Sequence, residues 1–211
     1  MIPIESIIAF VAASALLSIA PGPDNIFVLT QSAIYGKKSG VMVTLGLCSG
    51  LIVHTTVVAL GVAAVFQTSL MAFTILKVAG ALYLLYLAWQ AFSVSAERFD
   101  SHGSALRSIG ALYRRGIIMN ITNPKVSIFF LAFLPQFTSP ENGALAPQIF
   151  LLGATFIVVA LVIFSGIAVL AGTLAGWLNS SPKAQVYLNR IAGTVFAGLA
   201  FKLVTSSANA E

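Results

Sequence analysis

Six long apolar runs follow one another along the chain, and short polar stretches separate them. A helix needs about 20 mainly apolar residues to cross the hydrocarbon core of a bilayer. The pattern therefore predicts an all-α membrane protein, a bundle of six transmembrane helices. Because the first run is long and broken, a re-entrant first segment with five full spans is the alternative. The runs cover residues 4–35, 40–66, 70–92, 116–138, 146–178 and 186–204.

Composition excludes a separate soluble domain. Of the 211 residues, 58% are hydrophobic and 8% are charged, whereas soluble domains average about 25% charged residues. The net charge is +5, but no basic cluster alternates with aromatic residues, so we expect no nucleic-acid partner. The single cysteine, Cys48, can form neither an internal disulfide nor a CxxC pair, and the sequence indicates no metal or other cofactor.

Positive charges are distributed unevenly between the links. The odd-numbered links carry eight Lys and Arg residues, and the even-numbered links carry none. Links rich in Lys and Arg stay on the cytoplasmic side of the membrane, so both termini are predicted to face outward. The eight residues are Lys37, Lys38, Arg98, Arg107, Arg114, Arg115, Lys183 and, at a helix edge, Arg190.

The second half of the chain repeats features of the first. Residues 77–83 (KVAGALY) correspond to residues 190–196 (RIAGTVF), and residues 22–24 (GPD) correspond to residues 123–125 (NPK). Three helices followed by three similar helices have opposite orientations, as in inverted-repeat transporters, whose sites lie where matched helices are interrupted. We therefore predict one transmembrane domain. It would consist of repeat 1 at about 1–92, a cytoplasmic link at about 93–115 and repeat 2 at about 116–211.

Prolines interrupt the first and the fourth apolar run. A straight helix over the first run would be about 48 Å long, well beyond the roughly 30 Å hydrocarbon core. Pro21, Gly22 and Pro23 break this run, because prolines remove amide donors and disfavour helical geometry in the preceding residue. Pro124 breaks the fourth run. Backbone groups freed at such depth need partners from protein, water or ligand, and the breaks are candidate gating elements.

Asp24 and Lys125 are the only charges expected well inside the membrane, one at each break. A charge at the centre of an isolated helix costs at least about 2.5 kcal/mol, so both side chains should face the interior and find partners. They form either a buried salt bridge that fixes helix register or a binding site. In a binding site, Asp24 would bind a substrate ammonium group or a proton, and Lys125 or adjoining amides would bind a carboxylate. A zwitterion would suit both charges.

Amide and imidazole side chains accompany the two charges. Asn25, Asn120 and Asn123 are candidates for orienting a substrate through hydrogen bonds, although an Asn beside a proline break is also a local cap. His54, midway along the second run, is a candidate proton relay or a packing residue. Together these side chains predict substrate and proton sites near the middle of the membrane.

One other transport function stays open, and enzyme classes are excluded. A metal or small-cation exporter would use Asp24, His54 and Cys48, but these have no ligand spacing on a common helix face, and Lys125 would repel the cation. An aspartic protease needs two interacting carboxylates and a serine hydrolase an element such as GxSxG, and the sequence has neither. The glycine pair at 46 and 50 indicates close helix packing, and small-residue faces permit a homodimer.

Four motifs together resemble the LysE/RhtB family of bacterial amino-acid exporters, in particular its homoserine/threonine-type branch. They are APGPDN at residues 20–25, GKKSG at 36–40, KVAGALYL at 77–84 and NITNPK at 120–125. The resemblance covers essentially the whole chain. It implies a multi-pass protein of the bacterial inner membrane that exports a neutral or hydrophobic amino acid or close analogue, driven by the proton-motive force. One acid and one base inside the membrane favour a zwitterion over a dibasic amino acid.

Overall fold

The structure is a computed structural model that describes residues 2–68, 70–93 and 108–205. These residues are helical apart from short connections, without a β-strand among them, so the all-α prediction is confirmed for the described part of the chain. The α-helices are α1 (Ile4–Ile19), α2 (Pro23–Tyr35), α3 (Lys37–Thr68), α4 (Leu70–Ser93), α5 (Ile109–Ile121), α6 (Pro124–Ile128), α7 (Leu145–Ser180) and α8 (Pro182–Thr205). Between α6 and α7 lie the π-helical segment η1 (Phe129–Phe133) and the 3-10 segments η2 (Leu134–Phe137) and η3 (Pro140–Asn142).

Among the described residues, two single helices and two bent helix pairs have the length and apolarity of membrane spans. Within the described residues, α3 over Lys37–Gly61 and α7 over Leu145–Ala171 each suffice to cross a bilayer singly. The bent pairs α1 with α2, and α5 with α6 to η2, each qualify as one broken span, which gives up to four spans by length and composition. Helices α4 and α8 have 24 residues each, and their crossing of the membrane stays a prediction.

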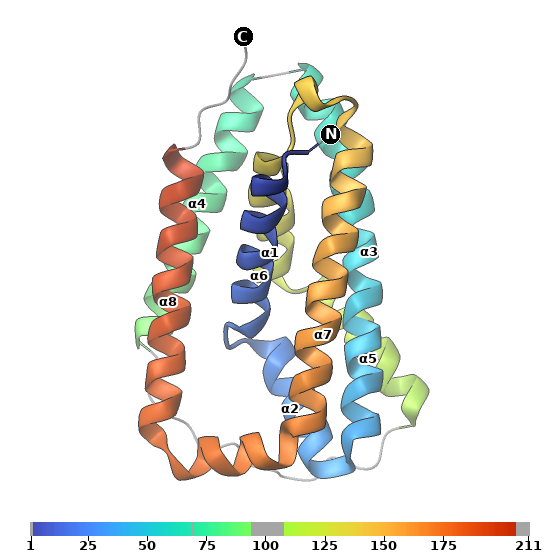
Figure 1. Ribbon diagram of the computed structural model, residues 1–211, viewed down its shortest axis with the longest axis vertical. Coiled ribbons are helices and arrows are strands. Elements are labelled where there is room, and N and C mark those ends of the chain that lie inside the picture. Colours follow the sequence, from blue (N-terminus) through green and yellow to red (C-terminus); the bar gives the residue numbers. More distant parts are fainter. Residues whose placement is uncertain (1, 69, 94–107, 206–211) are drawn as a thin grey trace.

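The first apolar run extends along the whole bundle as a broken span. In Figure 1, α1 begins near the upper end and α2 finishes at the lower end, with a bend of 58° between them. This course differs from that of a re-entrant loop, which returns to the side it came from. The following elements run up and down in turn, and α8 ends toward the same end as the start of α1. An even number of passages produces this arrangement, and the number six stays a prediction.

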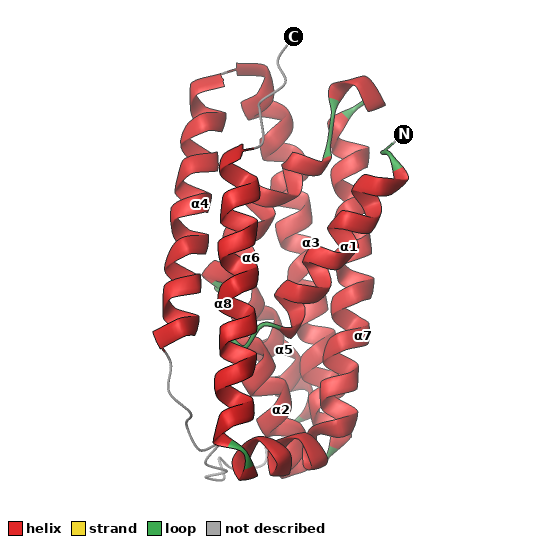
Figure 2. Cartoon of the chain, turned by 60° about the vertical axis from the view of Figure 1, so that its left-hand side comes forward, coloured by secondary structure: helices red, strands yellow, loops and turns green. Residues whose placement is uncertain are grey.

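Helices α3 and α7 hold the bundle together. Helix α3 packs against α5 and α7, helix α7 also packs against α1 and α2, and α4 pairs with α8 (Figures 1 and 2). Their buried apolar side chains form one main hydrophobic core. Its largest members form a phenylalanine cluster, with ring centroids 4.9 to 6.5 Å apart. The phenylalanine cluster consists of Phe10, Phe129, Phe130, Phe133, Phe137 and Phe156.

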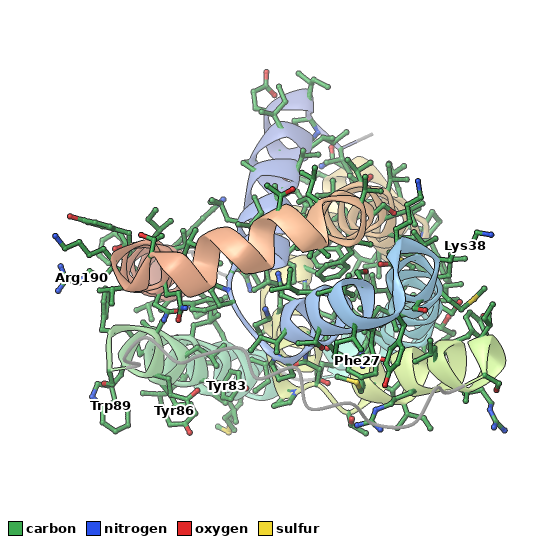
Figure 3. All side chains as sticks on the ribbon, turned by 90° about the horizontal axis from the view of Figure 1, so that it is seen from below. Phe27, Lys38, Tyr83, Tyr86, Trp89 and Arg190 are labelled. Atoms are coloured by element: carbon green, nitrogen blue, oxygen red, sulfur yellow. The ribbon has the colours of Figure 1, made fainter. Side chains whose placement is uncertain are left out.

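The outer faces of the helices are apolar, as contact with lipid requires. Leu60 and Phe201 are 69% and 72% exposed. Figure 3 shows Tyr83, Tyr86 and Trp89 in a row on the flank of α4 that faces away from the bundle. On a soluble protein so much exposed apolar surface would be unusual, whereas around a transmembrane bundle it is the surface that lipid covers.

The predicted boundary of the central link differs from the structure. The sequence predicts a link up to residue 115, but α5 begins at Ile109. The Ser108 hydroxyl caps this helix by accepting a hydrogen bond from the Ala111 amide at 3.3 Å. The last seven residues of the expected link, IGALYRR, are therefore the first two turns of a helix. Arg98 and Arg107 lie outside the described residues.

Glycines allow α3 and α5 to approach closely. A Cβ atom on Gly46 would clash with the backbone carbonyl of Tyr113, and a Cβ atom on Gly50 would lie 2.7 Å from Cβ of Asn120. The close packing predicted for this glycine pair is thus confirmed. Because α5 packs on this glycine pair, the pair offers no free surface to a second copy of the protein. The homodimer stays a prediction.

Replacing Gly46 with alanine should destabilise the protein, while the same change at Gly61 should not. A Cβ on Gly46 forces two backbones apart, at a cost of about 1–3 kcal/mol. A Cβ on Gly61 meets nothing within 4 Å, so its alanine should stabilise the helix by about 0.5–1 kcal/mol. Thermal denaturation of the purified protein in detergent measures the melting temperature of each variant. Equal melting temperatures for the two variants would contradict the close packing.

Candidate functional site

The break after α1 leaves four carbonyl groups without helical partners. The last helical hydrogen bond runs from the Ala20 amide to the Leu16 carbonyl. Gly22 is extended, and α2 begins at Pro23. A helix leaves the carbonyls of its last four residues unpaired, here those of residues 17–20. Inside a membrane these groups need partners from the protein.

Two side chains supply all four partners. The Asn25 amide donates to two of the carbonyls, and the Lys125 ammonium donates to the other two. Lys125 comes from the opposite half of the chain, so its bonds tie the second break to the first. Its charge also lies at the negative end of the α1 dipole, where a cation is stabilised. The bonds are Asn25 Nδ2 to Ser18 O (2.7 Å) and Ile19 O (3.4 Å), and Lys125 Nζ to Leu17 O (3.3 Å) and Ala20 O (3.1 Å).

The second break is capped locally by an asparagine. Helix α6 begins at Pro124, and Oδ1 of Asn123 accepts a hydrogen bond from the Lys125 amide at 3.0 Å. The cap role weighed for these asparagines is therefore present at Asn123, whose Nδ2 still has no partner. From α3, Nε2 of His54 donates to the Asn120 carbonyl at 3.1 Å. Helix α3 thereby joins the end of α5.

The two charges occupy the same position in the helices that follow the breaks. Proline is the first residue of both α2 and α6, and Asp24 or Lys125 is the second. Gly22 leaves room for the lysine, since a Cβ there would lie 3.0 Å from Nζ. The predicted breaks at Pro21–Pro23 and at Pro124 are present as bends of 58° and 49°. Their role in gating stays a prediction.

The Asp24 carboxylate is buried without a direct ion pair. Its side chain is 2% exposed, and Oδ1 has no hydrogen-bond partner. The polar side chains around it are those of Lys125, Asn123, Asn120 and His54. No N···O distance of 4.0 Å or less joins Asp24 to Lys125 in the described structure. A buried salt bridge between them is therefore not the observed arrangement.

A small cavity has both charges in its lining. Its volume is about 10 Å³, enough for roughly one water molecule. Four polar residues and five apolar residues face it, so a molecule in this place would meet one acid, one base and mostly apolar walls. The lining residues are Ser18, Asp24, Asn120 and Lys125, with Leu17, Leu51, Val126, Phe156 and Phe164.

Buried polar atoms without partners gather around the two breaks. Five of the seven such atoms found among the described residues belong to residues at the breaks or in the cavity lining. Each unpaired group costs about 1–3 kcal/mol, so a cluster of them indicates a place where water or a ligand completes the hydrogen bonds. These five atoms are Ser18 Oγ, Asp24 Oδ1, Asn25 Oδ1, Asn120 Oδ1 and Asn123 Nδ2.

The structure brings the predicted binding residues together, and their roles as ligands stay predictions. Asp24, Asn120 and Lys125 line the cavity, while Asn25 and Asn123 hold the two breaks. His54 reaches the edge of the site through the Asn120 carbonyl, with its ring 5.7 Å from that of Phe130. Sequence reasoning missed Ser18 and the apolar walls, because a serine or leucine in an apolar run carries no signal of the direction it faces.

The part of the chain that the structure describes contains no set of metal ligands for the cation-exporter alternative. No three of its His, Cys, Asp and Glu side chains come close enough to hold a metal ion. Cys48 is a buried free thiol on α3 and is not part of the cavity lining.

Comparison with known proteins identifies the family. The family described as LysE type translocator matches residues 15–207. The chain belongs to the LysE family. This LysE family protein is 40% identical to the homoserine/homoserine lactone efflux protein of Salmonella typhimurium over 189 residues, 89% of this chain and 90% of the relative. It is 26% identical to the leucine efflux protein of Salmonella choleraesuis over 200 residues, 93% of each chain.

Membership of the LysE family establishes the class of activity. LysE family proteins are translocators, so this protein is a transporter and not an enzyme, and the resemblance seen in its motifs is confirmed. An uncharacterized membrane protein of Vibrio cholerae is also 30% identical over 201 residues, 95% of this chain and 97% of the relative. No solved structure matches the chain.

Replacing Lys125 with methionine should lower the stability of this LysE family protein. The change leaves two α1 carbonyls unpaired and removes the positive neighbour of buried Asp24, and we expect it to cost about 1–3 kcal/mol for the lost hydrogen bonds. The matched control is Lys38→Met, because Lys38 is exposed at the start of α3 (Figure 3). Melting temperatures in detergent that fall equally, or not at all, for the two variants would contradict the capping role of Lys125.

Proposed function

We propose that the protein exports a neutral amino acid, bound as a zwitterion, across the bacterial inner membrane in exchange for protons. The observation that carries this proposal is the pairing of an acid, whose Oδ1 has no hydrogen-bond partner, and a base on one buried cavity whose other walls are mainly apolar. Both charges stand at interrupted helices, the positions where secondary transporters place their substrate sites.

The polar groups of the cavity match the two ends of a zwitterion. Oδ1 of Asp24 and Oδ1 of Asn120 are acceptors without partners, which suits a substrate ammonium group. The Lys125 ammonium has three donors and uses two on the α1 carbonyls. The third is free to meet a substrate carboxylate, so binding of the substrate need not disturb the end of α1.

The apolar walls favour a neutral side chain on the substrate. Leu17, Leu51, Val126, Phe156 and Phe164 supply these walls. A dibasic amino acid would bring a second positive charge, and Asp24 is the single acid among the described lining residues. The relatives named for homoserine and for leucine efflux act on amino acids with neutral side chains, which supports the same substrate class here.

The size of the cavity supports transport by alternating access. Ligand pockets usually measure about 300–1,000 Å³, whereas this cavity holds about 10 Å³, so a substrate requires the surrounding helices to move apart. Phe156 lines the cavity and belongs to the phenylalanine cluster. We assign this cluster to closure on one side of the site. Arg115, whose guanidinium lies 5.0 Å from the Phe27 ring centroid, joins α5 to α2 on the other side.

Matched features of the two halves support a 3+3 inverted repeat. Each half begins with an interrupted helix that restarts at proline followed by a charged residue, and the bends are of similar size at 58° and 49°. The contacts of α3 with α7 and of α4 with α8 each join a helix to its counterpart in the other half. Rocking of one repeat against the other is then the movement that opens the cavity on alternate sides.

The distribution of charges supports termini on the outer side of the inner membrane. The described Lys and Arg residues of the odd-numbered links belong to the starts of α3, α5 and α8, which lie at the lower end in Figure 1. The start of α1 and the end of α8 lie toward the opposite end. Positive charges stay inside, so the lower end would face the cytoplasm.

Competition at Asp24 supplies a mechanism for proton coupling. A protonated Asp24 cannot pair with a substrate ammonium, so proton and substrate would exclude each other at one carboxylate. His54 donates a hydrogen bond to the Asn120 carbonyl at the edge of the site, a position from which it can pass a proton.

Proteoliposomes test this function directly. Vesicles with an acidic interior should accumulate labelled homoserine or leucine as protons leave, and Asp24→Asn should reduce the rate about 10- to 100-fold, the value of a lost hydrogen bond to a charged group. The control is Glu141→Gln, because Glu141 is exposed in η3. Wild-type rates in the Asp24 variant, or uptake that ignores the proton gradient, would contradict the proposal.

A further inference from the structure

The Ser18 hydroxyl differs from most buried hydroxyl groups of the bundle. Serine and threonine in helices usually donate to the carbonyl four residues earlier. Ser14, Thr44 and Thr55 do so, at 2.7, 3.0 and 2.8 Å. Of the five buried serines and threonines that the structure describes, Ser18 and Ser32 have hydroxyls without a partner.

The position of Ser18 distinguishes its unpartnered hydroxyl from that of Ser32. It stands in the last turn of α1, where its backbone carbonyl accepts the bond from Asn25. The residue is 3% exposed and lines the cavity together with Asp24, Asn120 and Lys125. Its oxygen is thus an unpartnered polar atom at the site, whereas Ser32 is not part of the cavity lining.

The other polar groups of the cavity already have counterparts in a zwitterion. Under the proposed function, Asp24 and Asn120 hold the ammonium group and Lys125 holds the carboxylate. Ser18 is then the polar lining residue left over for the substrate side chain, and its neighbours in the lining are apolar. A hydroxyl both donates and accepts hydrogen bonds, so its natural complement is another hydroxyl.

We infer that Ser18 is a specificity-determining residue that hydrogen-bonds a hydroxyl group on the substrate side chain. The transporter therefore prefers hydroxylated neutral amino acids to analogues that lack the hydroxyl, because an analogue leaves Ser18 unpaired in a buried site. This inference rests on the proposed function and narrows its substrate class.

A pair of substrates that differ by one hydroxyl tests the inference. The efficiency of transport is measured in proteoliposomes for homoserine, for threonine and for 2-aminobutyrate, which has the same carbon chain without the hydroxyl. We expect the wild type to favour the hydroxylated substrates and Ser18→Ala to reduce that preference about 3- to 10-fold. Ser18→Thr, which keeps the hydroxyl, should retain much of it.

The matched control is Ser14→Ala, one turn earlier on the same helix. Because the Ser14 hydroxyl is bonded to the Phe10 carbonyl, its removal should leave the preference unchanged. Equal losses for all three substrates in Ser18→Ala, or an unchanged preference, would overturn the inference while the proposed function stands. Transport of leucine but of none of these three would also overturn the inference, whereas failure of the wild type to transport any of the four would contradict the proposed function itself.

Discussion

Four unpaired carbonyl groups at the end of α1 are the constraint on which the rest of the site depends. The proline break creates them inside the bundle, where bulk water cannot serve them, and Asn25 and Lys125 donate to all four. Because Lys125 follows the second break, the first break is completed only when the two halves of the chain have come together. A buried ammonium is thereby stabilised at the negative end of a helix.

Under the proposed function, the same interaction leaves Asp24 available to a substrate. Lys125 is close enough to offset part of the cost of burying the carboxylate, yet it directs its described hydrogen bonds to α1 instead of forming a salt bridge. A direct ion pair would satisfy both charges and leave little for a substrate.

Local signals in the sequence predict most of the fold and much of the site. Apolar runs and prolines are local, so the helices and the breaks at Pro21–Pro23 and Pro124 follow from them. The start of α5 is missed because the charged pair Arg114 and Arg115 interrupts the apolar pattern inside the helix and resembles the end of a loop. Pairing between atoms is not local: nothing in the sequence indicates that Lys125 caps α1 or that Ser18 faces the cavity. Those contacts depend on how distant helices pack.

Competition by analogues that lack one charge tests most directly whether Asp24 and Lys125 bind the two ends of a zwitterion. For homoserine, 4-hydroxybutyrate lacks the ammonium group and 3-aminopropanol lacks the carboxylate. We expect each deletion to weaken inhibition of wild-type transport strongly. In Asp24→Asn, loss of the ammonium group should no longer weaken inhibition, while loss of the carboxylate still does. In Lys125→Met, loss of the carboxylate should no longer weaken inhibition, while loss of the ammonium group still does. Coupling between contacting groups requires this pattern. Identical penalties in the wild type and both variants would contradict the assignment.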